Sequence, residues 1–213
     1  MTKSNKKSSR TRVGALLGTV VLGLVLGGLA LGSLGTPPSA SSAAATPEAT
    51  DAPPKAIPSM AEIQRRAQGV SVGADAAGPF YVFFDTQCPH CATLYRELEP
   101  LHASAKFIWV PVGVLSKFSV RQGATILGAP DPLAALQEHE KLMAKGPGGL
   151  AARKDPSEAS VKVMQSNTEV FRDLQARAVP FVVGLHAKTG LQVTHLGSGT
   201  TAQMAKLLGL PLP

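Results

Sequence analysis

Two cysteines stand close together in the stretch FFDTQCPHCATLY, which runs from Phe83 to Tyr95. Cys88 and Cys91 are the two cysteines of the 213-residue chain, and Pro89 and His90 separate them. A pair at this spacing can form a redox couple, supply half of a metal site or close a small structural disulfide. These three possibilities require different surroundings.

A metal site finds little support. A structural zinc ion usually takes four ligands, often from two cysteine pairs or from one pair and two spaced histidines. The chain has no second cysteine pair, and its histidines lack ligand spacing: His90, His102, His139, His186 and His195. Covalent haem attachment needs a histidine directly after the second cysteine, where Ala92 stands. We therefore expect neither a metal nor an organic cofactor.

The remaining choice is between a structural disulfide and a redox-active one. The stabilisation that a disulfide provides grows with the length of the loop it closes, so a bridge across two residues stabilises little. A redox couple is the favoured interpretation, and a non-catalytic binding module with a structural disulfide remains the alternative.

The residues around the pair favour redox chemistry. Pro89 is suited to the first turn of a helix, which places Cys88 just before the helix start. Unpaired N–H groups and the helix dipole there stabilise a thiolate, so we expect a lowered pKa and a nucleophilic Cys88. Cys91, one turn further on, is suited to resolving a mixed disulfide. His90 is expected to donate a hydrogen bond or positive charge toward Cys88, the alternative being a solvated turn histidine.

Alternating strand and helix patterns surround this motif. The run Phe80–Phe84 predicts a buried strand, and a helix is expected from Pro89 to about Ser104. Tyr95 and Trp109 are interpreted as core residues rather than groove residues. The other expected elements are a helix from Ser59 to Gln68 with a capping box, a strand over 106–115 that Pro111 bulges or ends, helices over 120–176 broken at 131–132 and 146–149, strands over 181–186 and 191–196, and a helix over 201–208. This order predicts an α/β fold, a mixed central sheet flanked by helices with a helical insertion at about 118–176.

The chain begins with a basic segment, residues 1–12. Five of the positive charges lie there without an acid, so that only +2 of the formal net charge of +7 remains for the rest. A nucleic-acid surface would need basic residues gathered on the folded part. We therefore expect no nucleic-acid partner.

Residues 13–34, VGALLGTVVLGLVLGGLALGSL, contain no charged residue. About 20 such residues can cross a bilayer as a helix, and the basic flank predicts a cytoplasmic N-terminus. We interpret the segment as a single-pass transmembrane signal anchor, with a cleaved signal peptide and a soluble periplasmic protein as the alternative. Residues 35–58 are rich in Pro, Ala and Ser and are expected to be a linker to a folded domain over 59–213.

The region 70–209, about two-thirds of the chain, resembles the thioredoxin superfamily, and within it the periplasmic disulfide interchange proteins of the DsbA, DsbC and DsbG type. The match to the DsbG catalytic domain rests on a strand that ends in Asp85, the Cys-Pro-x-Cys pair, the segment ATILGAPDP at 124–132, and Asn167 before Val179-Pro180. The Cys-Pro-His-Cys sequence and Val179 are more similar to DsbA, which implies a more oxidising couple. The stretch between the apolar segment and residue 59 is mostly linker and too short for the dimerisation domain of DsbC and DsbG, which counts against an isomerase.

The resemblance implies that Pro180 is cis and lies against the cysteines, and that the backbone of Val179 pairs with a substrate strand. An ordinary trans proline at the start of a strand is the alternative. Asp85 is either a proton-transfer group for Cys91 or a carboxylate that caps a turn.

Together these features predict an inner-membrane thiol:disulfide oxidoreductase whose catalytic domain faces the periplasm. Its expected partners are cysteine-containing exported proteins, and a membrane redox protein of the DsbB or DsbD type that resets the couple. A DsbG-like reductase or isomerase of periplasmic thiols is the alternative within the enzyme class.

Overall fold

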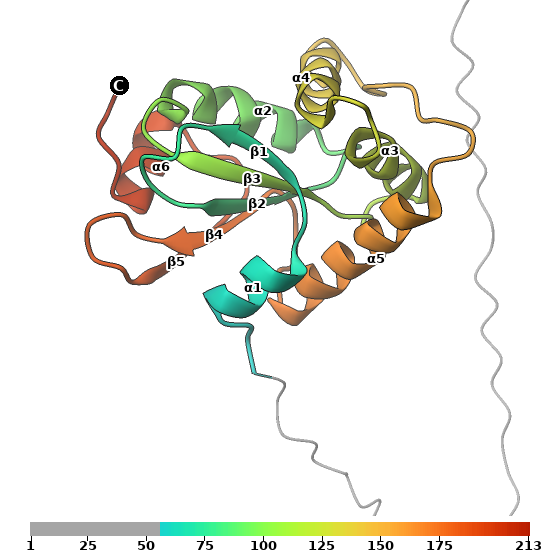
Figure 1. Ribbon diagram of the computed structural model, residues 1–213. Helices are drawn as coiled ribbons and strands as arrows, with labels where there is room; N and C mark the ends of the chain where they lie inside the picture. Colours follow the sequence, from blue (N-terminus) through green and yellow to red (C-terminus); the bar gives the residue numbers. More distant parts are fainter. Residues whose placement is uncertain (1–55) are drawn as a thin grey trace, which may run out of the picture. The chain divides into compact units, whose positions relative to one another are not determined.

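The computed structural model describes residues 56–213, and a five-stranded sheet lies at their centre (Figure 1). The strand order is β1-β3-β2-β4-β5, with β2 and β3 parallel and the other neighbours antiparallel. The strands are β1 (Val70–Gly73), β2 (Phe80–Phe84), β3 (Lys106–Pro111), β4 (Phe181–Leu185) and β5 (Gln192–Leu196). The predicted mixed sheet is confirmed.

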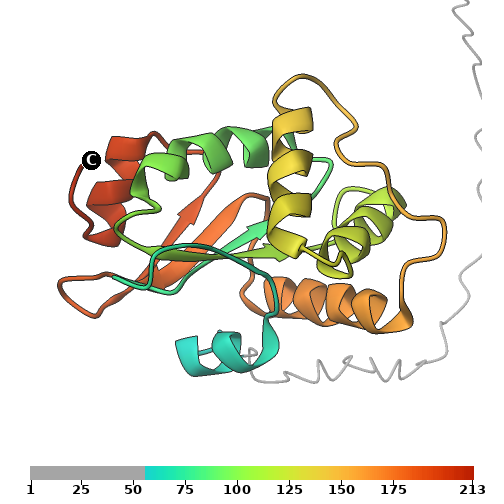
Figure 2. The ribbon, with the colours of Figure 1, turned by 45° about the horizontal axis from the view of Figure 1, so that its top comes forward.

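Helices cover both faces of the sheet. Figures 1 and 2 show α2 (Pro89–Leu98) and α6 (Thr201–Leu208) on one face, and α1 (Met60–Arg66) and α5 (Glu158–Asp173) on the other. The predicted helical insertion at about 118–176 contains three helices, α3 (Lys117–Leu127), α4 (Pro132–Met143) and α5. Helix α3 packs on α5, and α4 packs on α2. The insertion therefore reaches the helix that carries the cysteine pair.

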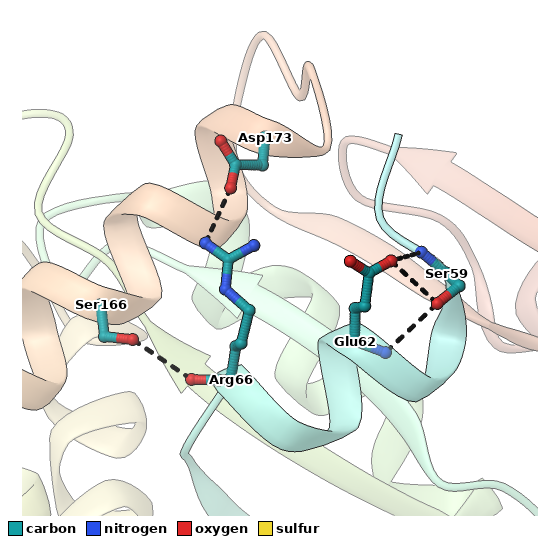
Figure 3. Close-up of polar contacts among 5 residues, drawn as sticks. All are labelled: Ser59, Glu62, Arg66, Ser166 and Asp173. Atoms are coloured by element: carbon teal, nitrogen blue, oxygen red, sulfur yellow. Dashed lines mark hydrogen bonds and ion pairs between the residues drawn. The ribbon is translucent and has the colours of Figure 1, made fainter. Parts of the chain in front are cut away.

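The short helix α1 begins at the predicted capping box. The hydroxyl of Ser59 accepts from the N–H of Glu62, whose carboxylate in turn accepts from the N–H of Ser59 (Figure 3). Arg66, in the last turn, donates to the carboxylate of Asp173 at 2.7 Å. Ser166 donates to the carbonyl of Arg66 at 3.4 Å. These contacts hold α1 against α5.

The core lies around β2, which is buried along its whole length because helices pack on both faces of the sheet. Trp109 of β3 is fully buried, and the centroid of its ring lies 4.9 Å from that of Tyr95, which is also buried, with the two rings tilted by 56°. Both are core residues, as predicted. Burial of each such large side chain contributes on the order of 1.5–3 kcal/mol, so this contact helps to hold α2 against β3.

Three elements differ from the sequence-based expectation. Helix α2 ends at Leu98 and continues as a 3₁₀ turn, η1 (Glu99–Leu101), because Pro100 cannot donate a helical hydrogen bond. Strand β3 ends at Pro111, the position that the sequence marks as a bulge or an end. Strand β1 was not predicted. Its four residues are held by antiparallel pairing with β3, a contact that local sequence does not encode.

Asn167 connects the helical insertion to the sheet. Its buried side-chain amide donates to the carbonyls of Gln68 and Pro111 at 2.7 and 3.1 Å, and its oxygen accepts from the N–H of Gln68 at 2.9 Å. The residue thereby satisfies backbone groups at the start of β1 and the end of β3.

No helix within residues 56–213 is long and apolar enough to cross a membrane. The predicted basic segment, the transmembrane anchor and nearly all of the linker lie outside the described residues.

Candidate active site

The cysteine pair lies where β2 gives way to α2. Cys88 is the N-cap residue of α2, with extended backbone angles, and Pro89 occupies the first turn, as predicted. Pro89 and His90 are exposed, whereas Cys88 is 5% and Cys91 1% exposed. Both cysteines are free thiols in this structure. The motif thus presents two exposed residues beside one marginally accessible sulfur and one shielded sulfur.

The two sulfurs have opposite protonation preferences. A hydrogen bond from the Cys91 side chain lowers the pKa of Cys88 to about 6, helped by backbone N–H groups of Cys91 and His90 and by the charge of His90, and opposed by burial. Burial raises the pKa of Cys91 well above its usual value, and the neighbouring Cys88 raises it further. At neutral pH, Cys88 is therefore the thiolate and Cys91 the thiol that stabilises it.

Val179 and Pro180 complete the site from the far end of the chain. The peptide bond between them is cis, as the resemblance implies. The Sγ atom of Cys88 lies 3.5 Å from the carbonyl oxygen of Val179. Both residues are buried and directly precede β4, which pairs with β2. The structure thus brings the predicted docking residues against the predicted nucleophile.

Asp85 is occupied by structural hydrogen bonds. Its carboxylate accepts from the N–H groups of Gln87, Val114 and Leu115, each at 2.9 Å, and from the hydroxyl of Ser119 at 2.6 Å. These bonds tie the end of β2 to the loop before α3. The geometry matches the capping interpretation, and a proton-transfer role for Asp85 stays a prediction.

Sequence reasoning missed a polar contact beside Cys88. Gln87 donates to the side-chain oxygen of Gln122 at 2.5 Å, and the amide of Gln122 donates to the carbonyls of Gly148 and Leu150. A cavity of about 490 Å³ opens at this point, lined by Gln87, Phe118, Arg121, Gln122 and residues 148–152. The insertion therefore forms one wall of a hollow next to the motif.

Sequence reasoning also missed two buried ionisable residues of α4. His139 is 1% and Glu140 3% exposed. Burial lowers the pKa of His139 to about 4, so its imidazole is neutral. Burial raises the pKa of Glu140 to about 8, and the charge of Cys88 adds to the rise. Their sequence context, LQEHEKLM, is typical of a solvated helix face, and the packing of α4 on α2, α3 and β1 buries them.

Within residues 56–213, no group of three or more His, Cys, Asp or Glu side chains is arranged to hold a metal ion. The chemistry that this site can perform with its own groups is thiolate attack on a disulfide by Cys88, followed by attack of Cys91 on the mixed disulfide.

Comparison with known proteins finds similarity to a disulfide interchange protein. No protein-family model matches the chain. The chain is 29% identical over 142 residues to the thiol:disulfide interchange protein DsbG of Pseudomonas aeruginosa, an alignment that covers 64% of this chain and 53% of the relative. The chain thus spans about half the length of the curated relative that it matches. This similarity confirms the resemblance predicted from the motif.

Solved structures show the same fold. ScsC of Proteus mirabilis in a transitional conformation aligns with a TM-score of 0.57 and 22% identity, over 69% of this chain and 73% of ScsC. A periplasmic thioredoxin-like protein of Salmonella enterica serovar Typhimurium aligns with a TM-score of 0.54 and 18% identity, over 65% and 87% of the two chains. The predicted thioredoxin-like fold is confirmed.

Proposed function

We propose that the chain is a thiol:disulfide oxidoreductase that exchanges disulfides with cysteine-containing exported proteins through Cys88 and Cys91. The observation that carries the proposal is that the pKa of Cys88 is lowered whereas the pKa of Cys91 is raised. Cys88 is held as a thiolate at a helix N-terminus, while Cys91 is a buried thiol that donates a hydrogen bond to it. The similarity to DsbG supports the same activity.

The reaction proceeds through a mixed disulfide. In the oxidising direction, a substrate thiolate attacks the Cys88 sulfur of the Cys88–Cys91 disulfide, and Cys91 leaves as a thiolate that takes up a proton. A second substrate thiolate then attacks the substrate sulfur of the mixed disulfide and releases Cys88 as a thiolate. The substrate loses two electrons and gains a disulfide, and the enzyme gains the two electrons as its dithiol.

The substrate is proposed to dock beside Cys88 on two sides. The carbonyl of Val179 lies 3.5 Å from the sulfur, so the segment that leads into β4 lies next to the reacting atoms. The hollow between Gln87 and the 148–152 loop provides room for side chains of the same segment. Exposed His90 contributes charge to the thiolate and lies where the attacking chain arrives.

Oxidation is the proposed direction. A lowered pKa of Cys88 stabilises the reduced form, which makes the disulfide a stronger oxidant. A DsbG-like reductase or isomerase is the second candidate, favoured by the similarity to DsbG. The reduction potential of the couple and its redox state in cells separate the two. A couple found mainly oxidised supports the oxidase, and one found mainly reduced supports the reductase.

We place the domain over 59–213 in the periplasm, joined by the linker at 35–58 to an inner-membrane anchor at 13–34. A membrane partner of the DsbB or DsbD type then resets the couple. The proposal rests on the charge-free apolar segment and its basic flank. Alkaline carbonate extraction tests it: the protein expressed from the full sequence should stay with the membrane pellet, and residues 56–213 alone should not. Release of a protein of lower mass than the full sequence supports a cleaved signal peptide.

The activity is tested by replacing each cysteine. Cys88→Ser should abolish insulin reduction and dithiol oxidation, and Cys91→Ala should accumulate mixed disulfides with substrates that run as reducible adducts on a gel. Thr93→Ala, a change one turn further into α2, is the matched control and should behave as the wild type. Full activity of Cys88→Ser rules out the enzyme, and an absence of adducts in Cys91→Ala supports a binding module instead.

A further inference from the structure

The shielded cysteine poses a problem of proton transfer. Cys91 is 1% exposed, and its thiol must lose a proton before it can attack the mixed disulfide on Cys88. In the opposite direction, Cys91 leaves as a thiolate and must regain a proton. Water has almost no access to this sulfur, so a neighbouring group has to accept and return the proton.

Two titratable neighbours are already engaged. The carboxylate of Asp85 accepts four hydrogen bonds, three from backbone N–H groups and one from the hydroxyl of Ser119 in α3. The Nδ1 atom of His139 accepts from the N–H of Leu150 at 3.2 Å, and the ring is also hydrogen-bonded to the backbone of Thr86. The hydrogen bonds of both side chains are therefore used to fix the surrounding loops.

Glu140 is different. It is 3% exposed, and neither carboxylate oxygen has a hydrogen-bond partner in the part of the chain that the structure describes. A buried carboxyl group without partners is costly, and such groups are rare in native proteins. A carboxyl group without hydrogen-bond partners is free to accept and release a proton.

Glu140 lies within electrostatic range of Cys88, the N-cap residue of α2, and of two side chains of that helix. Its charge acts on Cys91 and on Tyr95, which lie one turn apart on the same side of the helix, and the charge of Cys88 acts on Glu140. Helices α2 and α4 pack directly on each other. The carboxyl group therefore lies in the interface between the helices, on the side of the buried sulfur.

Glu140 also lies in the wall of a cavity, although both of its carboxylate oxygens are buried. About 500 Å³ of space lies between α4 and the segment formed by α2 and η1, with Glu140 and Tyr95 in its wall. The charged or titratable residues that share this wall are Arg96, Glu99, His102, Lys141 and Lys145.

We propose that Glu140 accepts the thiol proton of Cys91 when Cys91 resolves the mixed disulfide, and returns it when the Cys88–Cys91 disulfide is opened. In the resolving step, the proton passes from the thiol to the carboxylate, and the Cys91 thiolate attacks Cys88. The Cys88–Cys91 bond forms, the bond between Cys88 and the substrate sulfur breaks, and the substrate leaves as a thiolate with the electron pair. The inference rests on the proposed function.

The test uses 5,5′-dithiobis(2-nitrobenzoate) on the reduced full-length protein. Attack by Cys88 releases one coloured thiolate, and the subsequent attack by Cys91 on the mixed disulfide releases a second. Stopped-flow measurement separates the two releases, so the first reports on Cys88 and the second on Cys91 and its proton acceptor. The variant is Glu140→Gln, which keeps the size and removes the charge. The matched control is Glu138→Gln, on the exposed side of the same helix.

Glu140→Gln should leave the first release within about twofold and slow the second by about 100-fold, the lower end of the usual contribution of a positioned acid or base. In the wild type, the second release should speed up as Glu140 ionises, at a pH below about 8, because Cys88 carries no charge in the mixed disulfide and no longer adds to the raised pKa of Glu140. This rise should be absent in Glu140→Gln and present in Glu138→Gln.

A second release at the wild-type rate and pH dependence in Glu140→Gln overturns the inference. If that variant does not fold, Glu140→Asp decides, because a shorter carboxylate should slow only the second release. An unchanged second release in Glu140→Asp contradicts the inference. If the wild type itself shows no fast first release, the proposed function fails instead, so the two failures are distinguishable.

Discussion

The sulfur of Cys88 lies 3.5 Å from the carbonyl oxygen of Val179, a residue 91 positions later in the chain. The pairing of β2 with β4 brings the two together, because Phe83 is opposite Phe181 in the antiparallel ladder. Cys88 follows the C-terminal end of β2 and Val179 precedes the N-terminal end of β4, and these two strand ends are neighbours because the strands are antiparallel. The complete fold thus places the reactive sulfur beside the backbone of Val179.

Replacement of Cys91 by Ala should make Cys88 less reactive at neutral pH. The hydrogen bond from Cys91 is the largest cause of the lowered pKa of Cys88, about 6, so its loss moves that pKa back toward the usual value. Because only the thiolate reacts, iodoacetamide alkylation in the wild type should rise with pH to half its plateau near pH 6. At pH 7 a full return to the usual thiol pKa of about 8.5 would lower the thiolate fraction of Cys88 by about 30-fold, and the alkylation rate should fall toward that limit. An alkylation midpoint that stays near pH 6 in the variant shows that another group stabilises the thiolate.

Much of the local structure could be predicted from sequence. The capping box at Ser59 and Glu62, the buried run of β2 and the helix α6 carry strong local patterns, and all three occur in the structure. The N-cap position of Cys88 follows from Pro89 in the same way. These elements form for reasons that lie within a few residues of each other.

What sequence reasoning missed depends on distant contacts. Strand β1 is only four residues long, and it forms because β3 pairs with it. Glu140 has a charged neighbour on its own helix, Lys141, so the sequence alone predicts an exposed side chain. The packing of α4 against α2 is not visible in the sequence. The hydrogen bond between Gln87 and Gln122 spans 35 positions. Such features follow from tertiary packing, which overrides local pattern.

Asp85→Asn should lower the free energy of unfolding and leave the rate of thiol–disulfide exchange nearly unchanged. The carboxylate accepts four hydrogen bonds, and an amide that turns its NH₂ toward the donors of Val114 and Leu115 loses two of them. We expect the free energy of unfolding in urea to fall by about 1–3 kcal/mol. Asp75→Asn is the control. Asp75 is an exposed partner of Lys106, and its replacement should cost less than about 1 kcal/mol. A variant of wild-type stability with slow release of the mixed disulfide supports a proton-transfer role for Asp85.

Asn167→Ala should weaken the junction between the insertion and the sheet. The side chain satisfies the N–H and carbonyl of Gln68 and the carbonyl of Pro111, all in a buried setting. Leaving these groups without partners should lower the free energy of unfolding by about 3 kcal/mol. The neighbouring Ser166→Ala removes one long hydrogen bond, at 3.4 Å, and should cost less than about 1 kcal/mol (Figure 3). Equal urea midpoints for the two variants contradict this account.

Glu140→Gln should stabilise the protein at alkaline pH and leave it nearly unchanged in acid. Burial raises the pKa of Glu140 from 4.5 to about 8, so folding favours the protonated form. The stability that this preference provides is fully present below about pH 4.5 and is lost as the pH rises through 8. The free energy of unfolding of the variant minus that of the wild type should therefore grow between these limits, by at most about 1.4 kcal/mol per pH unit.

Urea unfolding of the reduced proteins at pH 5 and pH 8 measures this difference. The comparison of variant with wild type cancels the contributions of groups common to both. Because the charge of Cys88 adds to the raised pKa of Glu140, the pH dependence should be smaller when both proteins also carry Cys88→Ala. Glu138→Gln, which removes an exposed carboxylate from the same helix, should show no comparable growth. A difference that is the same at pH 5 and pH 8 means that the carboxyl group of Glu140 is solvated and cannot serve as an internal proton store.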